Sequence, residues 1–502
     1  MKYESTAQAL EQLQKLGKTY MAYVHAMGII ELDAATAAPS CSWEGRGQTT
    51  AILSEVMYDL IAAPENGALI AYLKESINQL SPVQRRELEV LEKQYLQMNR
   101  IPQEEYVAFN VLKNDSQASW EKAKAASDFT IFQPYLEKIL EFQKKFAGYY
   151  NADLPAYDAL LNEYEEGMTT EVLDAFFEKL RSVIVPLVNK ISRQAQPDHL
   201  FVNRSYPVDL QRKLSDFLME TMGIDRSRCG IAESEHPFTM NFNNKDVRIT
   251  THYYENNLLS SLFSVIHEGG HALYELGVDD KFNHTFLSGG SSMGIHESQS
   301  RFYENLIGRS RAFASYVLPK LKELFPEQLA DVDTDTFYRA VNQVKPSLIR
   351  IEADELTYCL HIMVRYELEK QLISGTLEAR DVPAAWNRLY REYLGVEVPG
   401  DAEGCLQDIH WSFGDLGYFP SYALGSAYGA QMLDVMEQQL GDVFADVEKG
   451  DLSRITGWLK QNIHQYACFK KPGQLFEDAC GTFDGNHYAD YLTKKFSELY
   501  NL

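Results

Sequence analysis

Two histidines and a glutamate stand close together in the segment His267-Glu268-Gly269-Gly270-His271. In a helix, a spacing of four residues places both imidazoles on one face, one turn apart, where they can bind a single Zn²⁺. Glu268 then lies beside the ion and can take a proton from a water molecule there. With 12 His and 71 acidic residues in the chain, chance produces roughly 0.04 such patterns. The alternative, a helix that carries two unrelated histidines, is therefore disfavoured.

A catalytic zinc site uses three protein ligands and keeps one position open. Glu297 is the candidate third ligand, because it follows His271 after a glycine-rich loop, Ser288 to Gly294, and stands near the start of a second helical segment. Glycines in that loop allow the chain to turn and bring the second helix beside the first. An ion pair between Glu297 and Arg301, one helical turn further on, explains the same glutamate equally well. Spacing alone leaves both interpretations open.

The histidine motif is one of six that follow each other along the chain. The six are His236-Pro237-Phe238, Asp246-Val247-Arg248-Ile249-Thr250, His267 to His271, His296-Glu297-Ser298-Gln299, Ile349-Arg350-Ile351-Glu352-Ala353-Asp354, and Gly404-Cys405-Leu406-Gln407-Asp408-Ile409-His410-Trp411. In this order they resemble the motifs of the thermostable carboxypeptidases, the carboxypeptidase Taq-type family of zinc metallopeptidases. The resemblance covers the whole chain, which also agrees with the family in length and helical character.

The resemblance implies that His267, His271 and Glu297 bind one Zn²⁺ per chain and that Glu268 acts as general base and acid. Co²⁺ can occupy similar ligands. A homodimer and peptide substrates with a free carboxy terminus are implied as well. The family usually has Trp-Asp, Thr and Met-Pro near the amino terminus, where this chain reads Leu32 to Pro39. That departure touches no predicted metal ligand.

Removal of a carboxy-terminal amino acid requires recognition of a free carboxylate. A planar guanidinium suits this task, because it donates two parallel hydrogen bonds. Arg350 is the first candidate and Arg248 the second. Each has a structural alternative, because Arg350 can pair with Asp354 one helical turn away and Arg248 can pair with Asp246 along a strand.

Other polar side chains lie further along the motif series. In helical zinc peptidases of related fold, a His and a Tyr downstream of the zinc site hydrogen-bond the oxyanion, and His410 and Tyr422 fit these positions. Tyr418 is the reserve for Tyr422, and the chain has 30 Tyr, so simple packing remains an alternative. Gln407 supplies a further hydrogen-bonding group for the substrate. His236 either binds substrate or supports the neighbouring strands.

Helices must position most of these residues. Helical periodicity predicts helices over Pro82 to Asn99, Gln103 to Ala126, Thr170 to Arg193, Leu258 to Leu276, His296 to Phe313, Leu348 to Ser374, Asp381 to Tyr393 and Ser421 to Gln439. Alternating apolar and polar residues from Pro237 to Tyr253, around Asn243-Asn244-Lys245, predict a β-hairpin. We therefore expect a mainly α body with a deep groove between two lobes and a small antiparallel β-sheet beside the active site. Residues 1–502 form one catalytic unit, and no function follows for the stretch His464 to Gly481.

Composition excludes several other classes of protein. The 47 Lys+Arg and 71 Asp+Glu give a net charge of −24, which disfavours nucleic acid and anionic membranes as partners. Six scattered cysteines do not resemble a disulfide framework, and the amino terminus lacks the pattern of a secretory signal. No segment approaches the about 20 apolar residues that a membrane-spanning helix needs. We expect a cytoplasmic protein.

Two other functions remain as alternatives. A zinc oligopeptidase or dipeptidyl carboxypeptidase of related fold shares the metal chemistry but cuts further inside the peptide. A non-catalytic zinc scaffold is disfavoured, because a structural site has four protein ligands and no need for an adjacent base such as Glu268. The sequence therefore favours a zinc carboxypeptidase of broad specificity.

Overall fold

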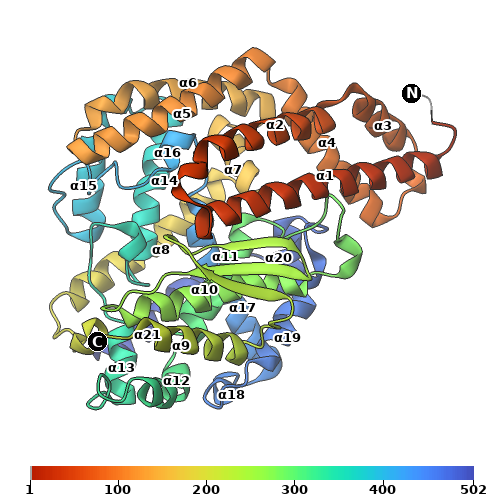
Figure 1. Cartoon of the computed structure of the whole chain (residues 1–502). Coiled ribbons are helices and arrows are strands. Elements are labelled where there is room, and N and C mark those ends of the chain that lie inside the picture. Colours follow the sequence, from red (N-terminus) through yellow and green to blue (C-terminus); the bar gives the residue numbers. More distant parts are fainter. Residues whose placement is uncertain (1–2) are drawn as a thin grey trace.

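The computed structural model describes residues 3–502, and the predicted mainly α fold is confirmed. The first half contains the helices α1 (Thr6–Thr36), α2 (Trp43–Ala62), α3 (Pro64–Glu75), α4 (Pro82–Arg100), α5 (Gln103–Ala126), α6 (Gln133–Tyr150), α7 (Ala156–Tyr164), α8 (Thr170–Ile191) and α9 (Val208–Thr221). Figure 1 shows α1 to α4, coloured red to orange, together on one side of the molecule. Their apolar faces form a small core of their own, to which Phe286 from the second half contributes.

The second half carries the helices that surround the predicted site. They are α10 (Leu258–Gly277), α11 (Met293–Arg301), α12 (Arg311–Leu324), α13 (Thr334–Val341), α14 (Tyr358–Ser374), α15 (Val382–Leu394), α16 (His410–Phe413), α17 (Pro420–Leu440), α18 (Phe444–Val447), α19 (Ser453–Asn462), α20 (Pro472–Cys480) and α21 (Asn486–Tyr500). Their buried side chains belong to one large core that also includes α5 to α9. Among residues 3–502, no helix combines the length and apolar character needed to cross a membrane.

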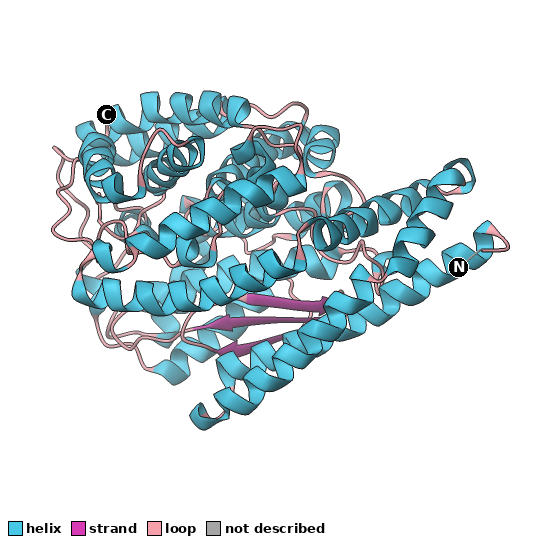
Figure 2. Ribbon diagram, turned by 90° about the horizontal axis from the view of Figure 1, so that it is seen from above, coloured by secondary structure: helices cyan, strands magenta, loops and turns pink. Residues whose placement is uncertain are grey.

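A three-stranded sheet lies between the N-terminal helices and the main body. Its strands are β1 (Cys229–Glu233), β2 (Thr239–Asn243) and β3 (Asp246–Thr251), in the order β1-β3-β2. β2 and β3 form the predicted hairpin, with Met240 opposite Arg248. The sheet is mixed rather than purely antiparallel, because β1 pairs with β3 in parallel. α10 packs against β3 and α1 against β2, so the sheet stands directly beside the helix with the histidine motif (Figure 1). Figure 2 shows the three strands between long helices.

Several helices begin and end close to the predicted positions. α5 has the predicted bounds, and α10 and α17 differ from them by one residue at each end or less. The continuous helix predicted from His296 to Phe313 is wrong, because α11 ends at Arg301 and a π-helical segment, Phe302–Ile307, follows it. α12 is a separate helix that begins where the Ser310 hydroxyl accepts a hydrogen bond from the Phe313 amide.

The helix predicted from Leu348 to Ser374 also starts later than expected. Only a short 3₁₀ turn, Arg350–Glu352, precedes α14, which begins at Tyr358. The Asp354 carboxylate accepts the backbone N–H groups of Leu356 and Thr357 and thereby holds this segment in a turn. A short acidic side chain that satisfies nearby backbone donors competes with helix formation in this way.

The stretch from His464 to Lys470 contacts the loop that leads into α11. The Cys468 thiol donates a hydrogen bond to the Gly290 carbonyl oxygen, and the Ser291 hydroxyl donates one to the carbonyl oxygen of Lys470. The His464 ring lies 2.8 Å from the Gln299 amide oxygen. This C-terminal stretch, which has no predicted role, therefore supports the glycine-rich loop and α11.

Candidate metal centre and active site

Helix α10 holds the two histidines of the motif on one face. The Asn257 side chain caps the helix by accepting a hydrogen bond from the Ser260 amide. The rings of His267 and His271 lie one turn apart, with centroids separated by 5.0 Å. Buried apolar residues cover most other sides of the helix. The predicted helix and the predicted common face of the two imidazoles are therefore present.

Helix α11 brings Glu297 to the same place. A Cβ atom at Gly270 of α10 would stand 2.6 Å from the Gln299 carbonyl oxygen of α11, so only glycine permits this approach of the two helices. On the other side, a Cβ atom at Gly425 of α17 would stand 2.7 Å from Cβ of Glu297. The helix that carries Glu297 is thus held closely between α10 and α17.

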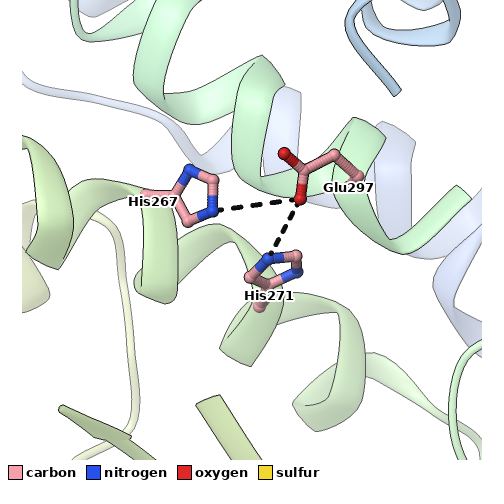
Figure 3. A group of neighbouring side chains, drawn as sticks. All are labelled: His267, His271 and Glu297. Carbon is pink, nitrogen blue, oxygen red and sulfur yellow. Dashed lines mark ion pairs between the residues drawn. The ribbon is translucent and has the colours of Figure 1, made fainter. Parts of the chain in front are cut away.

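The position of Glu297 is compatible with both interpretations that its spacing left open. Its Oε1 accepts a hydrogen bond of 2.7 Å from Nε of Arg301. Its Oε2 faces the two imidazoles, 3.9 Å from Nε2 of His267 and 3.6 Å from Nε2 of His271 (Figure 3). The ion pair with Arg301 is buried rather than solvated, and it orients the second oxygen toward the histidines.

The three side chains fit a divalent transition-metal ion. One ligand atom of each, His267, His271 and Glu297, lies within 4.8 Å of the other two. Ligand bonds of about 2.0–2.2 Å in a tetrahedral site place neighbouring donor atoms about 3.4 Å apart. The observed nitrogen–oxygen separations of 3.6 and 3.9 Å approach this value. Two imidazoles and one carboxylate leave a fourth position open, as in a catalytic site.

A buried charge network supports His267 from behind. Its Nδ1–H donates a hydrogen bond of 2.8 Å to Glu304, which also pairs with Arg301 and Arg309. Burial alone raises the pKa of Glu304, but Arg301 and the other cations lower it well below its usual range. Burial likewise lowers the pKa of His267, and the carboxylates of Glu304 and Glu297 outweigh this and raise it. The network fixes the ring so that Nε2 points to Glu297.

The two histidines differ in their electrostatic surroundings. Burial lowers the pKa of His271 well below its usual value. A neutral imidazole is the form that binds a metal ion. His271 is therefore held in a metal-binding protonation state even before an ion arrives.

Glu268 lies beside the candidate metal ligands, and its carboxylate has a hydroxyl partner. Its Oε2 accepts a hydrogen bond of 2.7 Å from the Thr239 hydroxyl of β2. Burial raises the pKa of Glu268, and the nearby His267 and the Thr239 hydrogen bond partly oppose this. A carboxyl group with a raised pKa can both accept and return a proton near neutral pH. The sheet thus holds the candidate base in place.

A cavity of about 350 Å³ opens over these residues. It is lined by Pro237, Phe238, Thr239, His267, Glu268, His271, Met293, His296, Glu297, Tyr418, Ser421 and Tyr422. Tyr418 and Tyr422 therefore line the same cavity as the candidate metal ligands and Glu268. Their two rings lie 5.3 Å apart.

His410 lies next to this wall of the cavity. Its ring contacts those of Phe419, Tyr418 and Tyr422, with centroid separations of 4.5, 5.4 and 6.4 Å. Burial lowers the pKa of His410 to about 4, although Asp408 opposes the change. Among the described residues, none forms a hydrogen bond with its Nδ1.

Arg350 forms a buried ion pair, but with Asp408 instead of Asp354. Its Nε and Nη2 donate to Oδ1 of Asp408, and its Nη1 donates to the Tyr358 hydroxyl. Arg365 binds the other oxygen of Asp408, so two guanidinium groups share one carboxylate. The Arg350 side chain is only 7% exposed and packs against the ring of Tyr422.

The remaining predicted substrate-binding residues have structural contacts. Arg248 donates two hydrogen bonds of 2.9 Å to Asp246, which is the alternative predicted for it. Gln407 accepts the backbone N–H of Arg350 and donates to the Leu348 carbonyl oxygen. His236 is exposed, and its carbonyl oxygen accepts a hydrogen bond from Ser234. None of the three is among the residues that line the cavity.

Sequence reasoning missed several residues that complete the site. Thr239 bonds Glu268 from the adjacent strand, and Glu304 and Arg309 support His267. The one available signal was position, because Glu304 follows Glu297 by seven residues, which is two helical turns. A β-strand residue such as Thr239 gives no comparable signal, because its contact depends on how the sheet packs on α10.

Comparison with known proteins agrees with this geometry. Residues 12–496 match the profile of the carboxypeptidase Taq (M32) metallopeptidases. Carboxypeptidase 1 of Bacillus subtilis is 40% identical over 482 residues, which cover 96% of each chain. Thermostable carboxypeptidase 1 of Pyrococcus furiosus is 33% identical over 97% of this chain and 98% of its own. The crystal structure of the M32 carboxypeptidase from Deinococcus radiodurans R1 superposes with a TM-score of 0.96 at 36% identity, covering 98% of this chain and all of the other. With its metal-ligand cluster and a match over nearly its whole length, the chain belongs to the carboxypeptidase Taq (M32) family of metallopeptidases.

Proposed function

We propose that this metallocarboxypeptidase uses zinc to hydrolyse the last peptide bond of peptides and releases single amino acids with broad specificity. The observation that carries the proposal is the placement of Glu268 beside the cluster of His267, His271 and Glu297 in one cavity. Two imidazoles and a carboxylate are ligands that suit Zn²⁺, and Co²⁺ can replace it in such a set. An ion held there polarises the peptide carbonyl group and makes a water molecule more acidic.

Glu268 is the general base and acid in this proposal. It accepts a proton from the attacking water and later delivers it to the nitrogen of the leaving amino acid. The hydrogen bond from Thr239 restricts the carboxylate and leaves its other oxygen available for the proton. Its raised pKa supports the return of that proton in the second half of the reaction.

Tyr422 and His410 are proposed to stabilise the negative charge that develops on the carbonyl oxygen. Tyr422 lines the cavity, and burial keeps its pKa well above the usual value, so the hydroxyl remains protonated and can donate. His410 is neutral at physiological pH, because its pKa is about 4. Tyr418 lies beside Tyr422 and is the reserve donor.

Arg350 is the proposed receptor of the substrate carboxylate, with Arg248 as the second choice. Arg350 belongs to a buried cluster in which two guanidinium groups share Asp408, which leaves an excess positive charge next to Tyr422. Among residues 3–502, its Nη1 has one hydrogen-bond partner, the neutral Tyr358 hydroxyl at 3.2 Å. Gln407 acts indirectly by holding the Arg350 backbone, and His236 contributes at the end of the cavity formed by Pro237 and Phe238.

Broad specificity follows from the proposed mode of binding. β2 is an edge strand of the sheet, and its Thr239 lines the cavity. A peptide that adds to such an edge is held by main-chain hydrogen bonds, which do not depend on side chains. We further propose that the protein acts as a homodimer in the cytoplasm, a reducing compartment that suits its six unpaired cysteines.

The experiment that tests the reaction compares one peptide with its carboxy-amidated form by time-resolved mass spectrometry. We expect a ladder that loses one residue at a time from the free peptide only, that stops with a chelator and that resumes with Zn²⁺. Equal cleavage of the amidated peptide would indicate an oligopeptidase. Loss of two residues per step would indicate a dipeptidyl carboxypeptidase.

The role of Glu268 is tested by Glu268→Gln, with the exposed Glu235→Gln as a matched control. Loss of a general base lowers turnover by about 10²–10⁴-fold. We expect such a loss in Glu268→Gln with the bound metal retained, and normal turnover in Glu235→Gln. Turnover of Glu268→Gln within threefold of the wild type would rule out the assignment.

A further inference from the structure

A second imidazole stands directly behind the metal ligand His271. Nδ1 of His296 lies 2.7 Å from Nδ1 of His271, and the ring centroids are 4.7 Å apart. On its other side, Nε2 of His296 lies 2.8 Å from Oε1 of Glu275. His296 therefore connects a metal ligand to a buried carboxylate through two short hydrogen bonds.

The position of each proton in this series of hydrogen bonds, from His271 through His296 to Glu275, follows from the contacts. Nε2 of His271 faces Glu297 and must carry a lone pair to bind an ion, so the ring hydrogen of neutral His271 lies on Nδ1. That N–H donates to Nδ1 of His296, which must then be the acceptor. The hydrogen of His296 lies on Nε2 and donates to Glu275. Each ring N–H in this series of hydrogen bonds therefore has one acceptor.

The ring of His296 is confined on several sides. Tyr274 packs against it with a centroid separation of 5.0 Å. A Cβ atom at Gly290 would stand 2.6 Å from Cδ2 of His296, so the glycine-rich loop lies tightly over the ring. The Gly290 amide donates to the same oxygen of Glu275 that accepts from His296. Confinement of this kind leaves His296 little freedom to turn away from His271.

The two metal-binding histidines are therefore supported in different ways. His267 donates to a carboxylate, Glu304, whereas His271 donates to a neutral imidazole. A carboxylate partner increases the basicity of the bound ring, while a neutral acceptor mainly fixes its tautomer and orientation. The negative charge of Glu275 is separated from His271 by the full width of the His296 ring.

We propose that His296 is a positioning residue that holds His271 in the tautomer and orientation that bind the metal ion, and that Glu275 in turn sets the tautomer of His296. The inference rests on the proposed metal ligands His267, His271 and Glu297 and not on the proposed reaction. Its test therefore measures ion binding, and it can fail while the proposed cleavage stands, or the reverse. Partners of this kind change metal affinity by about 10–100-fold when they are replaced.

The test replaces His296 by phenylalanine, which retains an aromatic ring beside Tyr274 but offers no acceptor to His271. Zinc affinity is measured by competition with a chromogenic chelator, and the visible absorption of the Co²⁺-loaded protein reports on ligand geometry. We expect His296→Phe to bind Zn²⁺ about 10–100-fold more weakly and to show an altered Co²⁺ spectrum. His296→Asn, which restores an acceptor oxygen, should recover part of the affinity.

His361→Phe is the matched control. His361 is also buried, packs against Tyr390 with a centroid separation of 5.5 Å and lies 3.0 Å from its hydroxyl, but it belongs to α14 and its partner is not a metal ligand. Its loss should lower the melting temperature and leave metal affinity and the Co²⁺ spectrum unchanged. Metal affinity of His296→Phe within twofold of the wild type, or an equal loss in His361→Phe, would overturn the proposal.

Glu275→Gln tests the proton assignment separately. The amide oxygen of glutamine can accept from both His296 and Gly290, so we expect metal affinity within about threefold of the wild type, because only hydrogen-bond acceptance is needed. A loss as large as that of His296→Phe would show that the carboxylate charge, and not the acceptor, matters. That result would contradict the proposal that Glu275 acts only as the acceptor that sets the tautomer of His296.

Discussion

Gly270→Ala and Gly269→Ala form a matched pair that tests how the metal site is assembled. Both glycines lie inside α10, between the two metal-binding histidines, and in both cases the change adds one methyl group. Alanine is more favourable than glycine inside a helix by about 0.5–1 kcal/mol. If helix propensity alone mattered, both variants would be slightly more stable than the wild type.

The surroundings of the two positions differ. At Gly270 the new Cβ would stand 2.6 Å from the Gln299 carbonyl oxygen and 2.7 Å from Cα of Ser300, both in the backbone of α11. At Gly269 the near atoms are Sδ and Cε of Met222, both 2.7 Å away, at the end of a flexible side chain. Met222 can turn aside, whereas α11 cannot, because Gly425 of α17 already touches Glu297 on the opposite face.

These distances give the expected loss of stability and metal affinity in Gly270→Ala. The new Cβ at Gly270 falls about 0.8 Å short of the 3.4 Å at which ordinary contact begins, so α10 and α11 must separate by a similar amount. Metal–ligand bonds tolerate about 0.2 Å. Overpacking of this kind costs about 1–3 kcal/mol, which exceeds the gain in helix propensity. We expect Gly270→Ala to melt at a lower temperature and to bind Zn²⁺ at least about tenfold more weakly.

The assays are thermal melting of the metal-free protein and metal competition with a chelator. Gly269→Ala should melt within a few degrees of the wild type and keep its metal affinity. Unchanged metal affinity in Gly270→Ala would refute the argument that the approach of α10 and α11 sets the site. Equal damage in both variants would refute it as well, since the two then could not differ through α11.

Two further predictions concern stability away from the metal ion. Lys495 and Glu355 form a buried ion pair of 2.6 Å, with side chains 8% and 2% exposed. Removing either partner should therefore lower the free energy of unfolding by about 3–5 kcal/mol, and the double variant Lys495→Met/Glu355→Gln should recover most of this loss in melting experiments. Additive losses would contradict the pairing. Burial raises the pKa of Glu165 to about 7, above the value near 4.5 expected in the unfolded chain. The folded state then holds the proton more tightly, so stability is lost as pH rises from about 4.5 to about 7, by about 3 kcal/mol. Glu165→Gln should flatten this part of the stability–pH profile, and an unchanged slope would assign the proton uptake to another group.

The sequence predicts those parts of the fold that depend on local signals. α5 starts directly after Pro102 and ends where Ser127 adopts a left-handed conformation, so breakers and periodicity define its bounds. The sequence does not reveal the helix break after Arg301, because the apolar pattern continues while the backbone changes to a π-helix and then ends before Ser310. β1 was missed because a five-residue parallel strand obtains its hydrogen bonds from β3 and carries little pattern of its own.

In the candidate site, too, the sequence predicts contacts between neighbours along the chain but not contacts between distant residues. His267 and His271 are fixed by one helical turn, and Glu297 by its motif. The structural alternative predicted for Arg350 was an ion pair with Asp354 one turn away, but the structure pairs it with Asp408, 58 residues further on. Backbone amides near Asp354 had already used its carboxylate. Spacing rules describe which side chains share a helix face, and they contain no information about contacts made by packing.

The charges around the cavity explain how an acidic protein can attract a carboxylate. The whole chain carries a net charge of −24. Around the candidate metal ligands, Glu297 and Glu304 pair with Arg301 and Arg309. The carboxylate of Glu268 in the same cavity leaves one negative charge unpaired. A divalent ion changes this balance to one positive charge, and the cluster of Arg350, Arg365 and Asp408 adds another. Because surface charges are screened beyond about 8 Å at physiological salt, the acidic exterior hardly weakens this buried positive region. If Arg350 receives the substrate carboxylate as proposed, metal loading and anion recognition are coupled: without the ion, the acidic residues around the candidate ligands would repel the carboxylate that the arginines attract.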